Sequence, residues 1–216
     1  MGRKENTLIK ILTENDVIEL ANDNLPSIVN SVLHGNWKDE ILKVYKQLGG
    51  KEEAYAVRGK CKWDIITTQY IIELDEQLHF NDYRLIILSS PVYSELKAFP
   101  LDAYRNYCML YKENCLHAGS YGKKWTNNSC EKMFGSAQSI GDLSGNGSPR
   151  WKQRAFYDFV KDVSQLVTNI PVVRLSIYDI VEYQGRKYKL GDLLESDFTS
   201  SRDAASGIQK LINERI

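Results

Sequence analysis

The feature that most constrains this chain is a set of acidic side chains placed beside or within two short apolar runs. Asp64 precedes Ile65-Ile66, and Glu73 and Asp75 alternate with apolar residues in the second run. Because side chains alternate along a strand, Glu73 and Asp75 are expected on one face, about 7 Å apart. A buried carboxylate is costly without a partner, so these acids require an explanation.

The residues between the two runs, Thr67-Thr68-Gln69, predict a tight turn and therefore a hairpin. In such a hairpin Asp64 lies opposite the other two acids. Three converging carboxylates repel one another unless a cation lies between them, and hard oxygen ligands of this kind suit Mg²⁺. His79 follows the second run and adds a titratable group. The alternative interpretation is that these acids only mark where the strands reach solvent.

This segment resembles the central hairpin of the PD-(D/E)XK nuclease superfamily, particularly its very-short-patch-repair-like branch, with E-x-D in place of E-x-K. Asp64 matches the first acid and Glu73 the second, and His79 matches the trailing histidine. Asp75 stands at the position usually held by lysine. Either Asp75, as a further metal ligand, or His79, as a proton shuttle, would have to replace that lysine.

The resemblance implies an α/β fold, with one domain, a mixed central sheet flanked by helices, and a restriction-endonuclease-like core. It implies a metal-dependent endonuclease that cuts duplex DNA and leaves 5′-phosphate and 3′-hydroxyl ends, as a restriction or repair enzyme. The catalytic residues would be Asp64, Glu73, Asp75 and His79, and the first three would bind Mg²⁺, with Mn²⁺ as a substitute. A homodimer would allow both strands to be cut.

A helix followed by a strand is expected downstream, as that fold requires. Ser148-Pro149 is a typical helix beginning, and apolar residues then recur with helical spacing at Trp151, Ala155, Phe159 and Val163. Asn169 and Pro171 end this helix, and residues 172–177 are apolar enough for a buried strand.

Several basic or polar residues are candidates for contact with the DNA backbone. In the resembling branch the downstream helix presents such side chains to the DNA, and the basic stretches here contain aromatic residues, which suits phosphate contact and stacking. The alternative is an ordinary solvated surface. The candidates are Arg58, Lys123, Lys124, Arg150, Lys152, Gln153 and Arg154.

Length and charge limit the remaining possibilities. The chain has 216 residues, and its 28 basic residues balance its 28 acidic ones. One domain is expected at this length, and the zero net charge argues mildly against a non-specific nucleic-acid binder. No leader-like apolar segment follows the first residues and no run is long enough to cross a membrane, so we expect a soluble cytoplasmic protein.

The expected organisation has four parts: N-terminal helices in 1–50, the hairpin region in 51–80, an insertion in 81–149, and a helix, a strand and C-terminal elements in 150–216. The elements expected within them are two short helices in 14–34, a helix at 37–48, a strand at 54–57, a helix at 101–115, a long loop at 118–149, a hairpin at 177–191 turning at Gln184-Gly185, and helices at 190–194 and 202–216. The long loop of the insertion is expected either to recognise the target or to be a mobile surface loop.

A structural zinc site is not expected from the cysteines. Cys108, Cys115, His117 and Cys130 offer suitable ligands, but none of their spacings is the C-x2-C pair that makes such an assignment strong. Cys108 also lies among tyrosines in a helical pattern, where a buried thiol is ordinary.

Two other functions remain open from the sequence. A non-catalytic member of the same fold would bind nucleic acid or a protein partner, and the missing lysine favours it. A protein of another class would use its acids to bind a small phosphorylated ligand. Metal-dependent cleavage of DNA would identify a nuclease and exclude the first alternative. A preference for nucleotides over duplex DNA would identify the second.

Overall fold

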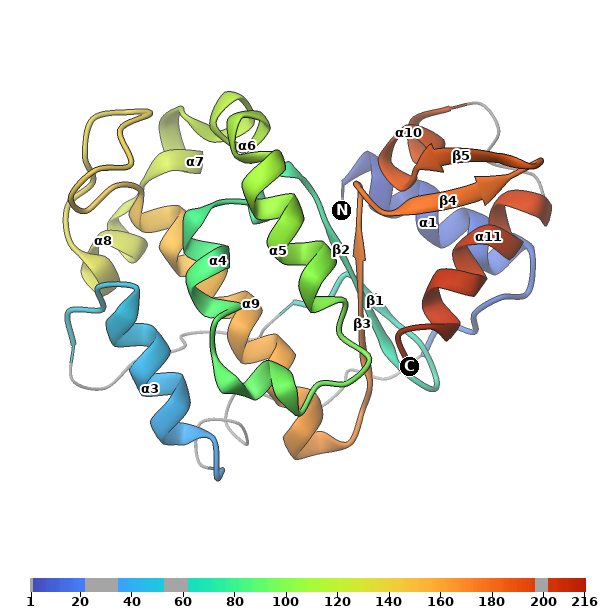
Figure 1. Cartoon of the computed structure of the whole chain (residues 1–216), viewed down its shortest axis with the longest axis horizontal. Helices are drawn as coiled ribbons and strands as arrows, with labels where there is room; N and C mark the ends of the chain where they lie inside the picture. Colours follow the sequence, from blue (N-terminus) through green and yellow to red (C-terminus); the bar gives the residue numbers. More distant parts are fainter. Residues whose placement is uncertain (1, 22–34, 53–61, 197–201) are drawn as a thin grey trace.

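A small mixed sheet crosses the middle of the molecule, and helices cover both of its faces (Figure 1). The computed structural model describes residues 2–21, 35–52, 62–196 and 202–216. Within them the chain forms a single, predominantly helical α/β domain. The predicted α/β class is therefore confirmed.

The predicted hairpin is the start of this sheet. Strand β1 (Ile65–Ile66) pairs antiparallel with β2 (Ile71–Asp75), and β3 (Val172–Ser176) joins β2 in parallel. The turn forms because the Thr67 hydroxyl accepts the backbone N–H of Tyr70 at 2.9 Å and donates to its carbonyl at 2.6 Å. The sheet is mixed, as predicted.

The helix expected before β3 is α9 (Pro149–Thr168), which packs against β3 and contacts β2 through the pair of Lys161 and Glu73. It begins where the Ser148 hydroxyl accepts the backbone N–H of Trp151, with Pro149 in the first turn. It ends at Asn169, whose φ of 55° is left-handed. The predicted stripe that includes Trp151 and Phe159 is fully buried, so this prediction is confirmed.

The remaining elements lie on either side of the sheet (Figure 1). The side that includes α9 also holds η1 (Gln77–His79), η2 (Pro91–Ser94), α3 (Lys38–Gln47), α4 (Asp82–Ile87), α5 (Leu101–Leu110), α6 (Lys112–Gly119), α7 (Gly122–Trp125) and α8 (Asn128–Phe134). The other side holds α1 (Arg3–Glu14), α10 (Leu190–Glu195), α11 (Arg202–Asn213) and a hairpin of β4 (Ile180–Tyr183) and β5 (Arg186–Lys189).

The C-terminal elements follow the predictions closely. Gln184 and Gly185 both have positive φ, of 49° and 70°, as a two-residue hairpin turn requires. The predicted helix at 37–48 is α3, and those at 190–194 and 202–216 are α10 and α11.

The N-terminal prediction was wrong in position. The helix is α1, which ends at Glu14 rather than starting there, because the Asn15 side chain donates to the Ile11 carbonyl and Asp16 takes a φ of 56°. Leu20 then bridges to Thr67 beside β1. The rest of the segment expected to hold two short helices, from 22 to 34, and the expected strand at 54–57 lie outside the described residues.

Two predictions in the insertion were also wrong. The helix expected at 101–115 is divided into α5 and α6 at Tyr111, which leaves helical geometry and stacks on Tyr178 with 3.6 Å between ring centroids. The long loop expected at 118–149 contains α7 and α8. Trp125 anchors this segment because its ring is buried against Trp151.

None of the helices in the described ranges is both long enough and apolar enough to cross a membrane.

Candidate functional site

The predicted acids lie on one face of the sheet, toward α9. Asp64 is opposite Glu73, and its backbone N–H donates to the Glu73 carboxylate at 3.2 Å. Its own carboxylate accepts the backbone N–H of Leu74 at 2.9 Å. Glu73 and Asp75 lie on one face of the sheet together with Arg174 of β3. The Arg174 guanidinium contacts both carboxylates.

Glu73 and Asp75 nevertheless have different principal partners. The Glu73 carboxylate lies 2.6 Å from Nζ of Lys161, on α9. The Asp75 carboxylate accepts a hydrogen bond from Nη1 of Arg174 at 2.8 Å. Glu73 and Asp75 therefore form two adjacent acidic sites with different partners, whereas one site shared by the acids of the hairpin was predicted.

Among the described residues, a group that could hold a metal ion consists of Asp75, His79 and Asp158. One ligand atom from each lies within 4.8 Å of the others. Nδ1 of His79 is 2.8 Å from Asp158 and 3.2 Å from Asp75. The set combines two carboxylates with an imidazole. Asp64 and Glu73, which were predicted as ligands beside Asp75, are outside this group.

Each member of this group has a distinct structural support. Asp75 ends β2, η1 turns the chain so that His79 faces back toward Asp75, and α9 provides Asp158. Asp75 and Asp158 are buried, whereas 21% of the His79 side chain is exposed. The group therefore reaches solvent through the imidazole.

Asp75 has one carboxylate oxygen without a hydrogen-bond donor. Oδ1 receives the Arg174 hydrogen bond, but Oδ2 has no hydrogen-bond partner within the described part of the chain and is fully buried. The Arg84 guanidinium lies 3.8 Å from Oδ2, which is too long for a hydrogen bond. A buried, unsatisfied anionic oxygen is costly, and a bound cation would satisfy it.

Two buried arginines, Arg174 and Arg84, donate hydrogen bonds to the buried acids. Arg174 donates from Nε to Asp162 at 2.7 Å and from Nη1 to Asp158 at 3.3 Å. Arg84, on α4, donates to Asp162 at 3.2 Å. The Tyr93 hydroxyl adds a hydrogen bond to Asp162 at 2.7 Å. Asp162 is therefore fully engaged with its neighbours.

The pKa values of two buried acids, Glu73 and Asp158, are shifted in opposite directions. Burial raises the pKa of Glu73 to about 7, because the loss of hydration outweighs the positive charges of Lys161 and Arg174. Burial also disfavours ionisation of Asp158, but the positive charges of its three basic neighbours outweigh it and hold the pKa of Asp158 well below its usual value.

Four residues of this network were not predicted from the sequence: Asp158, Lys161, Arg84 and Arg174. A signal existed for Arg174, because it interrupts the apolar run Val172-Val173-Arg174-Leu175, where an unpaired charge is as costly as at Glu73. Asp158 and Asp162 are four residues apart on one helix face. Their burial depends on the tertiary packing of α9, so the spacing alone did not mark them.

The predicted DNA-contacting residues do not share one environment. Lys123 and Lys124 are exposed on α7. Gln153 is buried, with its amide nitrogen 3.3 Å from the Ser129 hydroxyl and 3.2 Å from the Met133 sulfur. Lys152 is also buried.

The other predicted basic residues also have different hydrogen-bond partners. Arg150 hydrogen-bonds the Gln153 side chain, and Arg154 donates to the Leu78 carbonyl at 3.4 Å. Arg58 lies outside the described residues.

The described cysteines are all buried free thiols: Cys108, Cys115 and Cys130. The Cys115 sulfur lies 3.6 Å from the Asn81 amide nitrogen, and Cys130 caps the first turn of α8. His117 is exposed on α6.

Comparison with known proteins places the chain in one family. Residues 43–196 match a family of unknown function, DUF7255, and the chain belongs to this family. This region includes Asp75, His79 and Asp158 together with the basic residues around them. No curated protein and no solved structure gives a significant match.

Proposed function

For this member of the DUF7255 family, we propose a metal-dependent hydrolase that cuts phosphodiester bonds in duplex DNA. The proposal combines the resemblance of the β1–β2 hairpin to the PD-(D/E)XK nucleases, and the restriction-endonuclease-like core this implies, with the group of Asp75, His79 and Asp158. The observation that carries it is the buried Asp75 Oδ2 atom, which lacks a hydrogen-bond donor within the described residues.

These three residues would hold the metal. Two carboxylates favour Mg²⁺, and the imidazole makes Mn²⁺ the stronger probe. The bound ion would lower the pKa of a water molecule and stabilise the charge of the scissile phosphate.

The surrounding residues of the chain maintain this geometry. Arg174 and Arg84 hold the buried carboxylates and offset their mutual repulsion. Lys161 places an ammonium group beside Glu73, at the second acid of the hairpin. In this proposal Lys161 supplies from α9 the positive charge that the strand lacks at Asp75.

The first experiment compares wild type, His79→Gln and His117→Gln. His117 is exposed on α6, so its variant is a matched control for the loss of an imidazole. Each protein is titrated with Mn²⁺ in a calorimeter and incubated with plasmid DNA in Mg²⁺, Mn²⁺ or EDTA. We expect metal binding and metal-dependent cleavage in wild type and His117→Gln, and loss of both in His79→Gln.

Equal Mn²⁺ binding by all three proteins would contradict the assignment of the metal site. Metal binding at His79 without cleavage of DNA would retain the site but reject the nuclease activity.

A second candidate function is a non-catalytic member of the same fold that binds nucleic acid or a protein partner. The specific observation in its favour is that Arg174 already contacts both Asp75 and Asp158, at 2.8 and 3.3 Å. In that case the buried charges stabilise the fold and no metal is needed. Wild type would then bind no Mn²⁺ and leave DNA intact in every condition.

A further inference from the structure

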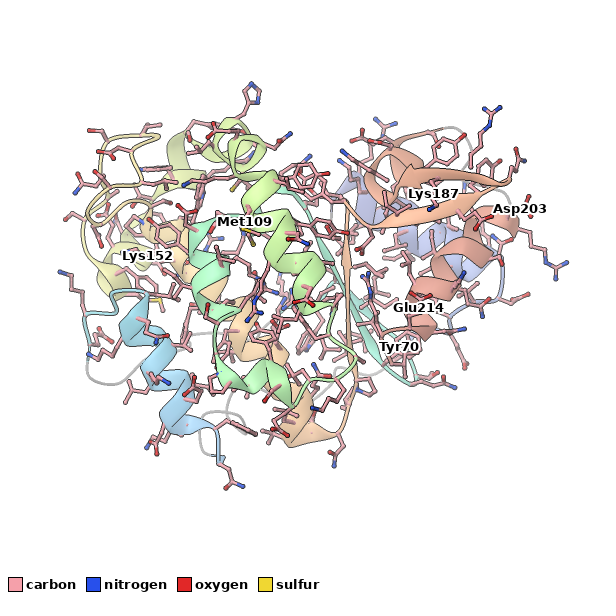
Figure 2. All side chains as sticks on the ribbon, in the orientation of Figure 1. Tyr70, Met109, Lys152, Lys187, Asp203 and Glu214 are labelled. Atoms are coloured by element: carbon pink, nitrogen blue, oxygen red, sulfur yellow. The ribbon has the colours of Figure 1, made fainter. Side chains whose placement is uncertain are left out.

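A second site of different chemistry lies where α3, α4, α8 and α9 meet. A cleft of about 780 Å³ is lined there by the end of α3 and the glycines and lysine that follow it, by Tyr83 and Ile86 of α4 and by Lys152 of α9. Ser136, Gly145 and Asn146 complete the lining. Its volume is in the range of sites that bind small molecules. Figure 2 shows Lys152 in this half of the molecule, far from Lys187 on the β4–β5 hairpin.

Lys152 is a buried cation in this cleft. It is only 6% exposed, yet within the described residues its ammonium group forms no ion pair. Its contacts are with neutral groups: Nζ donates to the Asn146 side-chain oxygen at 2.8 Å and lies 5.5 Å from the Tyr83 ring centroid. One acceptor leaves two of its three N–H donors available.

Lys51 adds a second positive charge to the same cleft. Burial lowers the pKa of Lys152, and the charge of Lys51 lowers it further. The Lys51 side chain is held against Gly135, where an added Cβ atom would lie 2.6 Å from its Cε atom. Two ammonium groups in one cleft repel each other, and an anion between them would relieve that repulsion.

The backbone of the cleft permits this close approach. Gly49 has a φ of 86°, and a Cβ atom there would lie 3.2 Å from Nζ of Lys152. Glycine therefore fits the backbone geometry and leaves the ammonium uncrowded. The nearby Asn146 amide donates to the Ser136 carbonyl, which orients its oxygen toward Lys152.

We propose that this cleft binds a phosphate group, which would lie between Lys51 and Lys152. An ammonium group is a natural point-charge partner for phosphate. Tyr83 and Ile86 would contact the less polar part of the ligand. The phosphate would belong either to a small molecule of nucleotide size or to a nucleic-acid backbone.

This inference is independent of the metal site, and its test is made in EDTA. Wild type, Lys152→Met, Lys51→Met and Lys187→Met are titrated with sodium phosphate against sodium chloride at equal ionic strength, and melting temperature and binding are measured. Lys187 is an exposed lysine on β5, so its variant is the control for the loss of one charge. Circular dichroism establishes that each variant folds.

We expect phosphate to raise the melting temperature of wild type and Lys187→Met. Loss of one charged hydrogen bond should weaken phosphate binding roughly ten-fold or more in Lys152→Met and Lys51→Met. If Lys152→Met does not fold, the exposed Lys51→Met variant decides the outcome. Equal phosphate effects in all four proteins, or none in wild type, would overturn the proposal.

Two competitors then identify the source of the phosphate. A nucleoside monophosphate that displaces inorganic phosphate more strongly than an oligonucleotide indicates a small-molecule ligand. The reverse order indicates a nucleic-acid backbone. Displacement by either competitor that persists in Lys152→Met would count against the site.

Discussion

Lys161 of α9 places its ammonium group 2.6 Å from the carboxylate of Glu73 on β2, although the two residues are 88 positions apart in the sequence. Both side chains are largely buried, with 13% and 3% of their area exposed. The ion pair attaches α9 to the sheet beside the candidate metal group. The positive charge at this acid therefore comes from a helix rather than from the strand itself.

The buried carboxylate of Glu73 should make stability depend on pH. Its pKa is raised from 4.5 to about 7 in the folded chain, so between these values the folded state holds a proton that the unfolded state has released. This contribution is fully present below pH 4.5 and is lost as the pH rises through 7. Glu73→Gln should gain stability relative to wild type over this interval, by on the order of 3 kcal/mol.

Urea unfolding of both proteins at pH 4.5, 6 and 7.5, in EDTA, measures this difference. Titrating groups that do not contact Glu73 are common to both proteins and largely cancel in the comparison. Lys161 does not cancel in this way, because burial opposes its charge and Glu73 raises its pKa, so the pH dependence of the difference, rather than its absolute size, reports the protonation of Glu73. Parallel profiles for the two proteins would show that folding does not raise the pKa of Glu73.

Arg174 should be the most costly residue of the network to replace. Arg174→Met removes donors from Asp75, Asp158 and Asp162 and leaves their charges uncompensated. Breaking buried pairs of this kind costs about 3–5 kcal/mol. Arg186→Met, at an exposed position of β5, should change the free energy of unfolding by less than about 0.5 kcal/mol.

Chemical denaturation of both arginine variants provides the measurement. A small effect of Arg174→Met, similar to that of Arg186→Met, would mean that the acids take up protons or repack without penalty.

The local patterns of the sequence were sufficient to predict much of the fold. The hairpin, α9, β3 and the Gln184-Gly185 turn each depend on neighbouring residues: alternation, a helix-capping serine, an apolar run and a turn pair. The break at Tyr111 was not predictable in this way, because it accompanies a stack on Tyr178, a long-range contact.

The candidate site was predictable only in part, for the same reason. Asp75 and His79 are close in sequence, and the resemblance to the nuclease hairpin placed both among the predicted catalytic residues. Asp158 comes from α9, and its position depends on how that helix packs against β3 and contacts β2. The partner of each acid is therefore a property of tertiary structure, and the sequence identified the acids of the hairpin but neither Asp158 nor the basic partners.

Two glycines with positive φ should respond differently to alanine. At Gly147, with a φ of 55°, a Cβ atom would lie 1.8 Å from the Tyr83 hydroxyl, which also accepts the backbone N–H of Ser148. At Gly185, with a φ of 70°, nothing lies within 4 Å. Gly185→Ala should cost about 1 kcal/mol from backbone strain alone, and Gly147→Ala should cost at least about 2 kcal/mol more because the buried tyrosine must move.

Thermal and urea unfolding of the two glycine variants tests this difference. Equal costs would indicate that the 144–148 turn can shift away from Tyr83.

The thiols of Cys108 and Cys115 should be nearly inert in the folded protein. Burial raises the pKa of Cys108 to about 12 and that of Cys115 to about 11. Alkylating reagents react with the thiolate, so at pH 8 both should be modified at least about a hundred-fold more slowly than in urea.

The measurement is iodoacetamide labelling followed by peptide mass spectrometry, in a background where Cys61 and Cys130 are replaced by serine. Labelling of either thiol at its unfolded rate would show that α5 and α6 open readily, since only exposure to water restores an ordinary thiol pKa.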